Sequence, residues 1–153
     1  MVPLAKGLGS GVPVGACVVG GRAKGVFKPG NHGSTFGGNP LAMTAVVATI
    51  DTIKEEGLLA NAARVGEVIR GGLPRRDGVV EVRGMGLMIG VELARPCGEL
   101  VRQALDAGLV LNVTADSVIR MLPPLVMNEA EAREVLARLL PLLEGFLDKR
   151  AAA

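Results

Sequence analysis

Residues 79–93 read VVEVRGMGLMIGVEL, and this stretch decides the fold class of the second half of the chain. Residues 79–82 and 87–93 are rich in valine, isoleucine and leucine, a composition that favours strands, and they flank a turn at 83–86. Around them, helices are predicted over residues 58–70, 98–107 and from Asn128 onward, where Asn128 and Glu131 form a capping box. Two more short strands are predicted over 109–112 and 118–122. The pattern indicates an α+β unit, with a few strands packed against helices.

The first part of the chain has a different character. Residues 1–40 are predicted to form glycine-rich loops around one short strand at 13–19. A helix is expected to begin at Asn39, a favourable N-cap, with Pro40 in its first turn. This helix is apolar almost all round, which predicts burial, yet the chain holds too little to cover it. We therefore expect that part of the protein is missing on the amino-terminal side, and that the isolated chain self-associates or covers this helix with a partner.

Composition excludes several classes of function. The chain is 49% apolar with a formal net charge of +2, and its basic residues are scattered, so nucleic-acid binding is not expected. Cys17 and Cys97 stand far apart and outside any metal-binding spacing, so no metal site is expected. The apolar stretch 41–50 is far shorter than the roughly 20 residues that cross a bilayer, and the start does not match a signal peptide. These features predict a soluble, cytoplasmic protein with two reduced thiols.

Lys6 is the first candidate site residue. It lies between the apolar residues 3–5 and the glycine-rich residues 7–11. A lysine in a desolvated site has a lowered pKa, and its neutral amine can attack a carbonyl, so Lys6 is a candidate Schiff-base lysine. The alternative is an ordinary surface lysine near the amino terminus. The local residues alone favour the surface lysine, because a lysine beside glycines is a weak signal.

Thr35 is the second candidate. It belongs to the loop 32–39, HGSTFGGN, which precedes the expected helix, and hydroxyl groups with free backbone amides at a helix start suit an anion. Thr35 is therefore a candidate phosphate ligand. The alternative is that Ser34 and Thr35 only satisfy loop backbone groups. His32, the only histidine, is expected to be structural.

Arg120 is the third candidate, because it lies in the middle of an apolar predicted strand. Its planar, forked guanidinium suits a substrate carboxylate. The alternative is a position on the solvent side of an edge strand, with a carboxylate partner inside the protein. Arg83 is expected to serve the turn between the two strands of the opening stretch.

Four motifs together resemble the class III aminotransferases, most closely those acting on acetylornithine and ornithine. They are residues 4–16, LAKGLGSGVPVGA; 32–42, HGSTFGGNPLA; 82–88, VRGMGLM; and 119–125, IRMLPPL. Their order and spacing match over nearly the whole chain. One departure is Ser10, where the family usually has glycine, a change that we expect to be tolerated.

The resemblance implies pyridoxal phosphate as cofactor and fold type I, an α/β fold, with residues 1–70 ending the large domain and 71–150 forming the small α+β domain; residues 151–153 are expected to be a frayed tail. By resemblance, Lys6 would be the catalytic, cofactor-binding lysine, and Thr35 would donate to the cofactor phosphate across a homodimer interface. Arg120 would bind the carboxylate of the amino acid or of 2-oxoglutarate.

The resemblance also implies an activity. It would be ping-pong transamination of acetylornithine with 2-oxoglutarate in arginine biosynthesis, or of ornithine, succinylornithine or 4-aminobutyrate in a close relative. Family members have a long region before this lysine, which supplies further cofactor contacts. The chain is therefore expected to be a carboxy-terminal fragment. The alternative is a non-catalytic remnant that folds and dimerises without cofactor.

Overall fold

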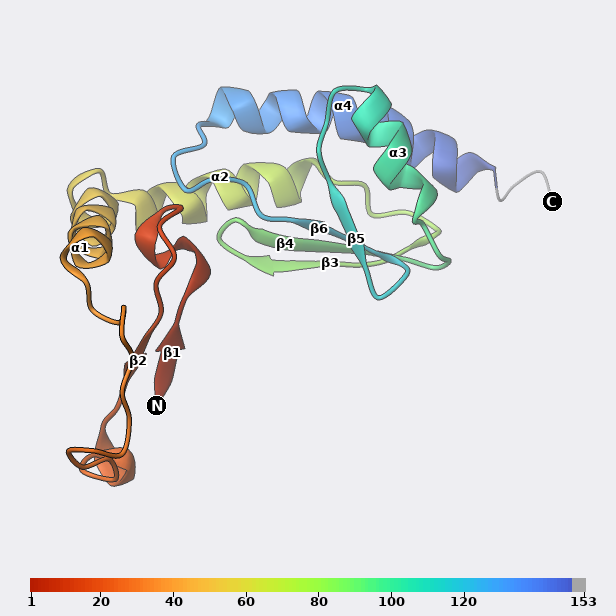
Figure 1. The fold of residues 1–153 in the computed structure, drawn as a ribbon. Coiled ribbons are helices and arrows are strands. Elements are labelled where there is room, and N and C mark those ends of the chain that lie inside the picture. Colours follow the sequence, from red (N-terminus) through yellow and green to blue (C-terminus); the bar gives the residue numbers. More distant parts are fainter. Residues whose placement is uncertain (150–153) are drawn as a thin grey trace. The chain divides into compact units, whose positions relative to one another are not determined.

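A computed structural model describes residues 1–149 of the chain, so the frayed tail expected at 151–153 lies outside the described residues. The chain has a mixed α/β fold and divides into two compact units, Met1–Gly57 and a second that begins at Leu58. Figure 1 shows the elements of both. Each unit is described below by itself.

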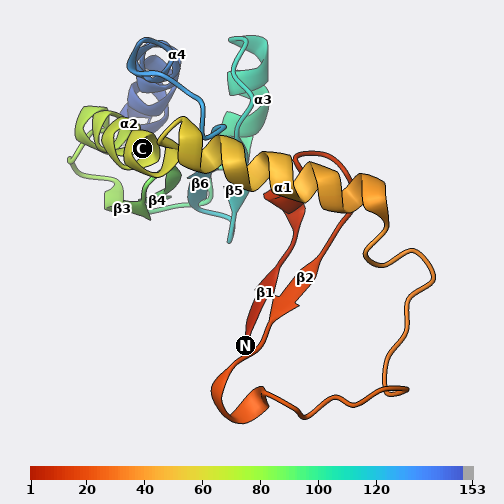
Figure 2. The same cartoon turned by 90° about the vertical axis from the view of Figure 1, so that its left-hand side faces the viewer.

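The first unit contains few elements for its length. Strand β1 (Val2–Leu4) pairs antiparallel with β2 (Ala16–Val18), and the short 3-10 helix η1 (Lys6–Gly9) lies between them in sequence. A second 3-10 helix, η2 (Gly21–Ala23), is followed by a long loop that reaches helix α1 (Pro40–Glu55), as Figure 2 shows. The predicted loops are therefore confirmed for most of residues 1–40, but the strand predicted at 13–19 covers only Ala16–Val18, and β1 was not predicted.

Helix α1 begins where the sequence predicts. Asn39 Oδ1 accepts a hydrogen bond from the backbone N of Ala42 at 3.0 Å, and Pro40 occupies the first turn. The helix contacts η1, yet Ala42 is its only buried residue. The prediction that α1 is buried is thus wrong for this chain, because the first unit provides only the two short strands β1 and β2 and no further α-helix to cover it.

The second unit is built on a four-stranded antiparallel sheet with the order β3-β4-β6-β5. The strands are β3 (Val79–Met85), β4 (Met88–Leu93), β5 (Asn112–Thr114) and β6 (Val118–Met121). The hairpin predicted from residues 79–93 is confirmed, but β3 runs on to Met85, so Arg83 lies within a strand and not in the turn. The strand predicted at 109–112 begins only at Asn112.

Three helices lie on one side of this sheet, as Figures 1 and 2 show. They are α2 (Leu58–Gly72), α3 (Glu99–Asp106) and α4 (Glu129–Asp148), and α4 begins with the predicted capping box at Asn128 and Glu131. Between helices and sheet lies one aliphatic core; its fully buried members include Val65, Ile69, Ile89, Val91, Leu100, Ile119, Leu139 and Leu143. The opposite face of the sheet is not covered by a helix of this unit.

Helix α2 belongs to the second unit, although the sequence places a domain boundary near residue 70. Gly66 shows why: a Cβ there would lie 2.1 Å from the backbone O of Gly86, so α2 is in close backbone contact with the β3–β4 turn. Arg70 Nη1 also donates to Gly86 O at 3.1 Å, and Asn61 Nδ2 donates to Leu125 O at 2.8 Å. These contacts put the division between the two units at Gly57.

Candidate functional site

Lys6 has an unusual backbone conformation. It follows β1, opens η1 and has φ 57°, in the left-handed region. For a residue with a side chain, this conformation costs about 1–2 kcal/mol, and such strain clusters at functional sites. The Lys6 side chain is exposed, and it makes no hydrogen bond or ion pair within residues 1–149. Its ε-amino group is therefore free to bind a ligand.

Two residues that follow Lys6 hold η1 in place. Gly9 is buried, and a Cβ there would lie 2.7 Å from Val14 Cγ1, so only glycine allows this turn to pack against Val14. Ser10 ends η1 with φ 47° and ψ 44°, again left-handed. This conformation explains why glycine is favoured at position 10 in the family that the sequence resembles.

The hydroxyl groups of Ser34 and Thr35, in the loop before α1, differ in their hydrogen bonding. Ser34 Oγ accepts a hydrogen bond from the backbone N of Gly37 at 3.0 Å, so this hydroxyl satisfies loop backbone. Thr35 is exposed, and its hydroxyl makes no hydrogen bond within the described part of the chain. The alternative in which these hydroxyls only satisfy loop backbone groups therefore holds for Ser34. The Thr35 hydroxyl remains available to an anion.

His32 packs against an aromatic ring. Its imidazole meets the Phe27 ring edge-on, with ring centroids 4.4 Å apart and planes at 85°. This contact agrees with the structural role expected for His32.

The charge of residues 1–50 suits an anionic ligand, although Asp51, Glu55 and Glu56 follow in the same unit. Residues 1–50 contain Lys6, Arg22, Lys24 and Lys28, and no aspartate or glutamate. All four basic side chains are exposed, and none forms an ion pair within residues 1–149. Uncompensated positive charge of this kind attracts phosphate and carboxylate groups.

Arg120 lies in the second unit, on strand β6. That strand is between β4 and β5, so Arg120 is not on an edge strand as one alternative proposed. Its side chain is exposed and has no hydrogen bond or ion pair among residues 1–149. The guanidinium is thus free for a carboxylate, whereas Ile119 and Met121 on either side are buried in the core.

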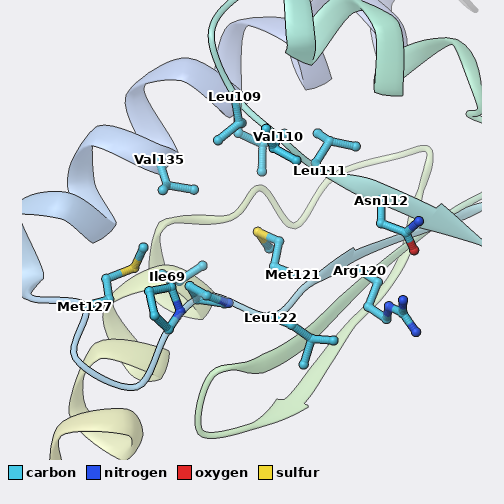
Figure 3. Close-up of a pocket in the computed structure, with 13 residues that line it drawn as sticks. Ile69, Leu109, Val110, Leu111, Asn112, Arg120, Met121, Leu122, Met127 and Val135 are labelled. Atoms are coloured by element: carbon cyan, nitrogen blue, oxygen red, sulfur yellow. The ribbon is translucent and has the colours of Figure 1, made fainter. Parts of the chain in front are cut away.

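A cavity of about 590 Å³ lies beside Arg120 in the second unit. Its lining is mostly apolar and comes from α2, α4, β6 and the segments 109–111 and 122–127. Figure 3 shows Arg120 and Asn112 at its margin, with the Arg120 guanidinium on the other side of β6 from the Met121 side chain. Arg120 and Asn112 are therefore polar residues at the edge of a mostly apolar cavity.

The three predicted site residues are divided between the units: Lys6 and Thr35 lie in the first unit, and Arg120 lies in the second. Within residues 1–149 no group of three or more His, Cys, Asp or Glu side chains could hold a metal ion. Cys97 is buried, and this burial raises the pKa of its thiol, whereas Cys17 is exposed. No helix among the described residues is both long and apolar enough to cross a membrane.

Sequence reasoning missed the role of Arg83. Its Nη1 donates to Glu81 Oε2 at 2.7 Å and also to Glu92 Oε2 across the hairpin. The hydrogen bond to Glu92 raises the pKa of Arg83 most, and the hydrogen bond to Glu81 raises it further. The signal was present, because a hairpin that pairs Met85 with Met88 places Arg83 opposite Gly90 and diagonally near Glu92.

Comparison with known proteins agrees with this arrangement of motifs. The family profile "Aminotransferase class-III" matches residues 1–143. Acetylornithine aminotransferase 1 of Bordetella bronchiseptica is 51% identical over 151 residues, which are 96% of this chain and 38% of that protein. Acetylornithine aminotransferase of Streptomyces coelicolor is 45% identical and covers 99% of this chain. The chain therefore spans about 38% of the length of the curated relatives that it matches.

Solved structures show the same likeness. An ornithine aminotransferase from Toxoplasma gondii has a TM-score of 0.87 and 32% identity, covering 99% of this chain and 37% of its own. Acetylornithine aminotransferase from Elizabethkingia anophelis has a TM-score of 0.80 and 31% identity, covering 92% of this chain and 37% of its own. The profile match, the sequence identity and the fold lead to one conclusion: the chain belongs to the class III aminotransferases.

Proposed function

We propose that the chain forms part of a pyridoxal-phosphate-dependent aminotransferase of fold type I, which transfers the amino group of acetylornithine to 2-oxoglutarate. The relatives with 45–51% identity are acetylornithine aminotransferases, which supports this substrate over ornithine, succinylornithine or 4-aminobutyrate. The first unit, Met1–Gly57, would end the large domain of this fold, and the second unit would form the small domain.

Lys6 would hold the cofactor through its ε-amino group and move a proton at the substrate carbon that bears the amino group. Bound there, the cofactor supplies an electron sink for the electrons that this carbon releases. The residues present fit this role, because the Lys6 amine is free and its backbone is held in a strained, left-handed conformation. Lys6 is also the only lysine among residues 1–149 with a left-handed backbone, which sets it apart from the other exposed lysines.

Thr35 would donate its hydroxyl proton to a phosphate oxygen of the cofactor, across the interface of a homodimer. The free hydroxyl of Thr35 and the absence of acidic residues from positions 1–50 support this assignment. Arg120 would bind the carboxylate of the amino acid and then that of 2-oxoglutarate. Its guanidinium is exposed and unpaired within residues 1–149, and its two parallel N–H groups match a carboxylate.

The observation that carries this proposal is the strained Lys6 with an unpaired amine, followed by the close-packed glycine turn. Its test is a spectroscopic titration of the chain with pyridoxal phosphate. A visible absorbance band is expected for the parent chain and for Lys24→Ala, a matched exposed lysine of the same unit. Lys6→Ala should lose the band. Equal bands for Lys6→Ala and the parent would contradict the assignment.

The phosphate role of Thr35 has its own test. Thr35→Val removes the hydroxyl and nearly keeps the shape, and it should weaken binding of pyridoxal phosphate about tenfold, the effect of one hydrogen bond to a charged group. Binding of pyridoxal, which has no phosphate, should not change. Ser34→Ala serves as the control, because the Ser34 hydroxyl is engaged by Gly37. An equal loss of affinity for pyridoxal phosphate and pyridoxal would show that Thr35 does not bind the phosphate.

A second function is favoured by the exposure of Lys6 and of α1: a non-catalytic unit that folds and associates without cofactor. This alternative predicts that no lysine of the parent chain gives a specific band with pyridoxal phosphate, although the chain folds.

A further inference from the structure

The uncovered face of the sheet carries two arginines in one row. Arg83, Gly90, Arg120 and Asn112 lie directly opposite one another on β3, β4, β6 and β5. Directly opposite residues of an antiparallel sheet point to the same face. The neighbouring row of Val82, Val91, Ile119 and Val113 packs in the core, so the arginine row points away from the helices.

The two guanidinium groups differ in their ion pairs. Arg83 donates to Glu81 and Glu92, and it is the only one of the two with ion pairs among residues 1–149. Arg120 has none. Both side chains are accessible to water, so burial does not cause the difference. The cause is the two carboxylates beside Arg83: Glu92, which reaches it from the neighbouring strand, and Glu81 on its own strand.

The Arg83 side chain lies over Gly90. A Cβ on Gly90 would be 3.8 Å from Arg83 Cγ, 3.9 Å from Arg83 Nε and 3.4 Å from Val118 Cγ1, so the missing side chain of Gly90 leaves Arg83 room on the strand between the two arginines. Two strand spacings separate Arg83 from Arg120, about 10 Å at their backbones. Arginine side chains are long enough to converge over that distance, so a released Arg83 would reach an anion bound at Arg120.

We propose that Glu81 and Glu92 are positioning residues: they hold Arg83, so that Arg120 is the one guanidinium of this face that is free for a substrate carboxylate. This inference rests on the role proposed for Arg120 above. With a single free guanidinium, the face binds one carboxylate, and it treats an amino acid and a dicarboxylate alike at this point. With two, it would favour dicarboxylates, because each carboxylate would find its own arginine.

The test measures how fast phenylglyoxal modifies each arginine of the full chain, mapped by peptide mass. In the parent, Arg120 should react about tenfold faster than Arg83, since a hydrogen bond to a charged partner is worth at least that factor. Glu81→Gln combined with Glu92→Gln should bring the rate of Arg83 up to that of Arg120, and Glu92→Gln alone should raise it part of the way. Glu134→Gln, which removes a partner of Arg138 elsewhere, should change neither rate. Far-ultraviolet circular dichroism checks that each variant folds.

A dicarboxylate, glutarate, is the probe for the binding step. It should protect Arg120 alone in the parent, and both arginines in the double variant Glu81→Gln, Glu92→Gln. Equal rates for Arg83 and Arg120 in the parent, or an unchanged Arg83 rate in the double variant, would overturn the role of the two glutamates. If the rates differ as expected but glutarate protects no arginine, the carboxylate role of Arg120 itself fails, and with it this inference and that part of the proposed function.

Discussion

At the residue scale, Ser10 combines a side chain with a left-handed backbone, φ 47°. Ser10→Gly should relieve about 1 kcal/mol of strain. Amide exchange of the turn that Ser10 closes, in which Val12 N donates to Gly9 O at 3.0 Å, should then slow about fivefold. Ala5→Gly is the matched control, because Ala5 is extended at φ −162° and should gain nothing. Equal effects of both substitutions would show that strain at Ser10 is unimportant.

The two cysteines give a second prediction at this scale. Cys97 is fully buried and its pKa is raised by that burial, so at any given pH less of it is thiolate. Cys17 is exposed on β2. Iodoacetamide should therefore modify one thiol per chain under native conditions, that of Cys17, and both in denaturant. Native alkylation of Cys97 at the rate of Cys17 would mean that the core around α3 opens readily.

At the element scale, short-range signals predicted helix starts well. Asn39 and Asn128 cap α1 and α4 through their own side chains, so their effect is local and visible in the sequence. The buried state of α1 was predicted wrongly, because burial depends on partners beyond the helix. The strand expected at 109–112 begins only at Asn112, where pairing with Arg120 of β6 becomes possible.

The cap of α4 allows a quantitative test. Asn128 Oδ1 accepts from Glu131 N at 2.9 Å, and Glu131 Oε2 accepts from Asn128 N at 2.8 Å. Asn128→Ala should lower the free energy of unfolding of the second unit by about 1 kcal/mol. Asn39→Ala removes the cap of α1, in the other unit, and should leave that free energy unchanged. Chemical denaturation followed by circular dichroism measures both; equal losses would mean that the units unfold as one.

Helix α1 also predicts association. Met43, Val47 and Ile50 follow helical spacing on one side of α1, and all three are exposed. Sedimentation of the parent chain should show association that grows with concentration, and Val47→Lys with Ile50→Lys should weaken it. Leu41→Lys, at a position on the other side of the helix, is the control. A parent chain that stays monomeric at high concentration would contradict this prediction.

At the scale of the whole molecule, the aliphatic core lies entirely within the second unit. A chain that begins at Leu58 should therefore fold and unfold cooperatively by itself, with a denaturation midpoint near that of residues 1–153. Residues 1–57 alone should lack a cooperative transition, since they bury little apolar surface. A loss of structure in the shorter chain would show that the first unit contributes to the core.

The candidate site shows which features the sequence could predict at this scale. Motif order predicted the family and the residues Lys6, Thr35 and Arg120, and comparison confirms the family. The Arg83–Glu92 pair was not predicted, because it depends on strand register. The motifs did not predict the exposure of Lys6 either, because burial depends on three-dimensional packing and not on the neighbouring residues in the sequence.

The central claim is that Lys6 alone among five lysines holds the cofactor. Its most direct test adds pyridoxal phosphate, reduces with borohydride and maps the pyridoxyl group by peptide mass. The account predicts that the label is concentrated on Lys6 and that Lys24, Lys28, Lys54 and Lys149 carry only traces. A label shared evenly between Lys6 and the other exposed lysines would contradict it.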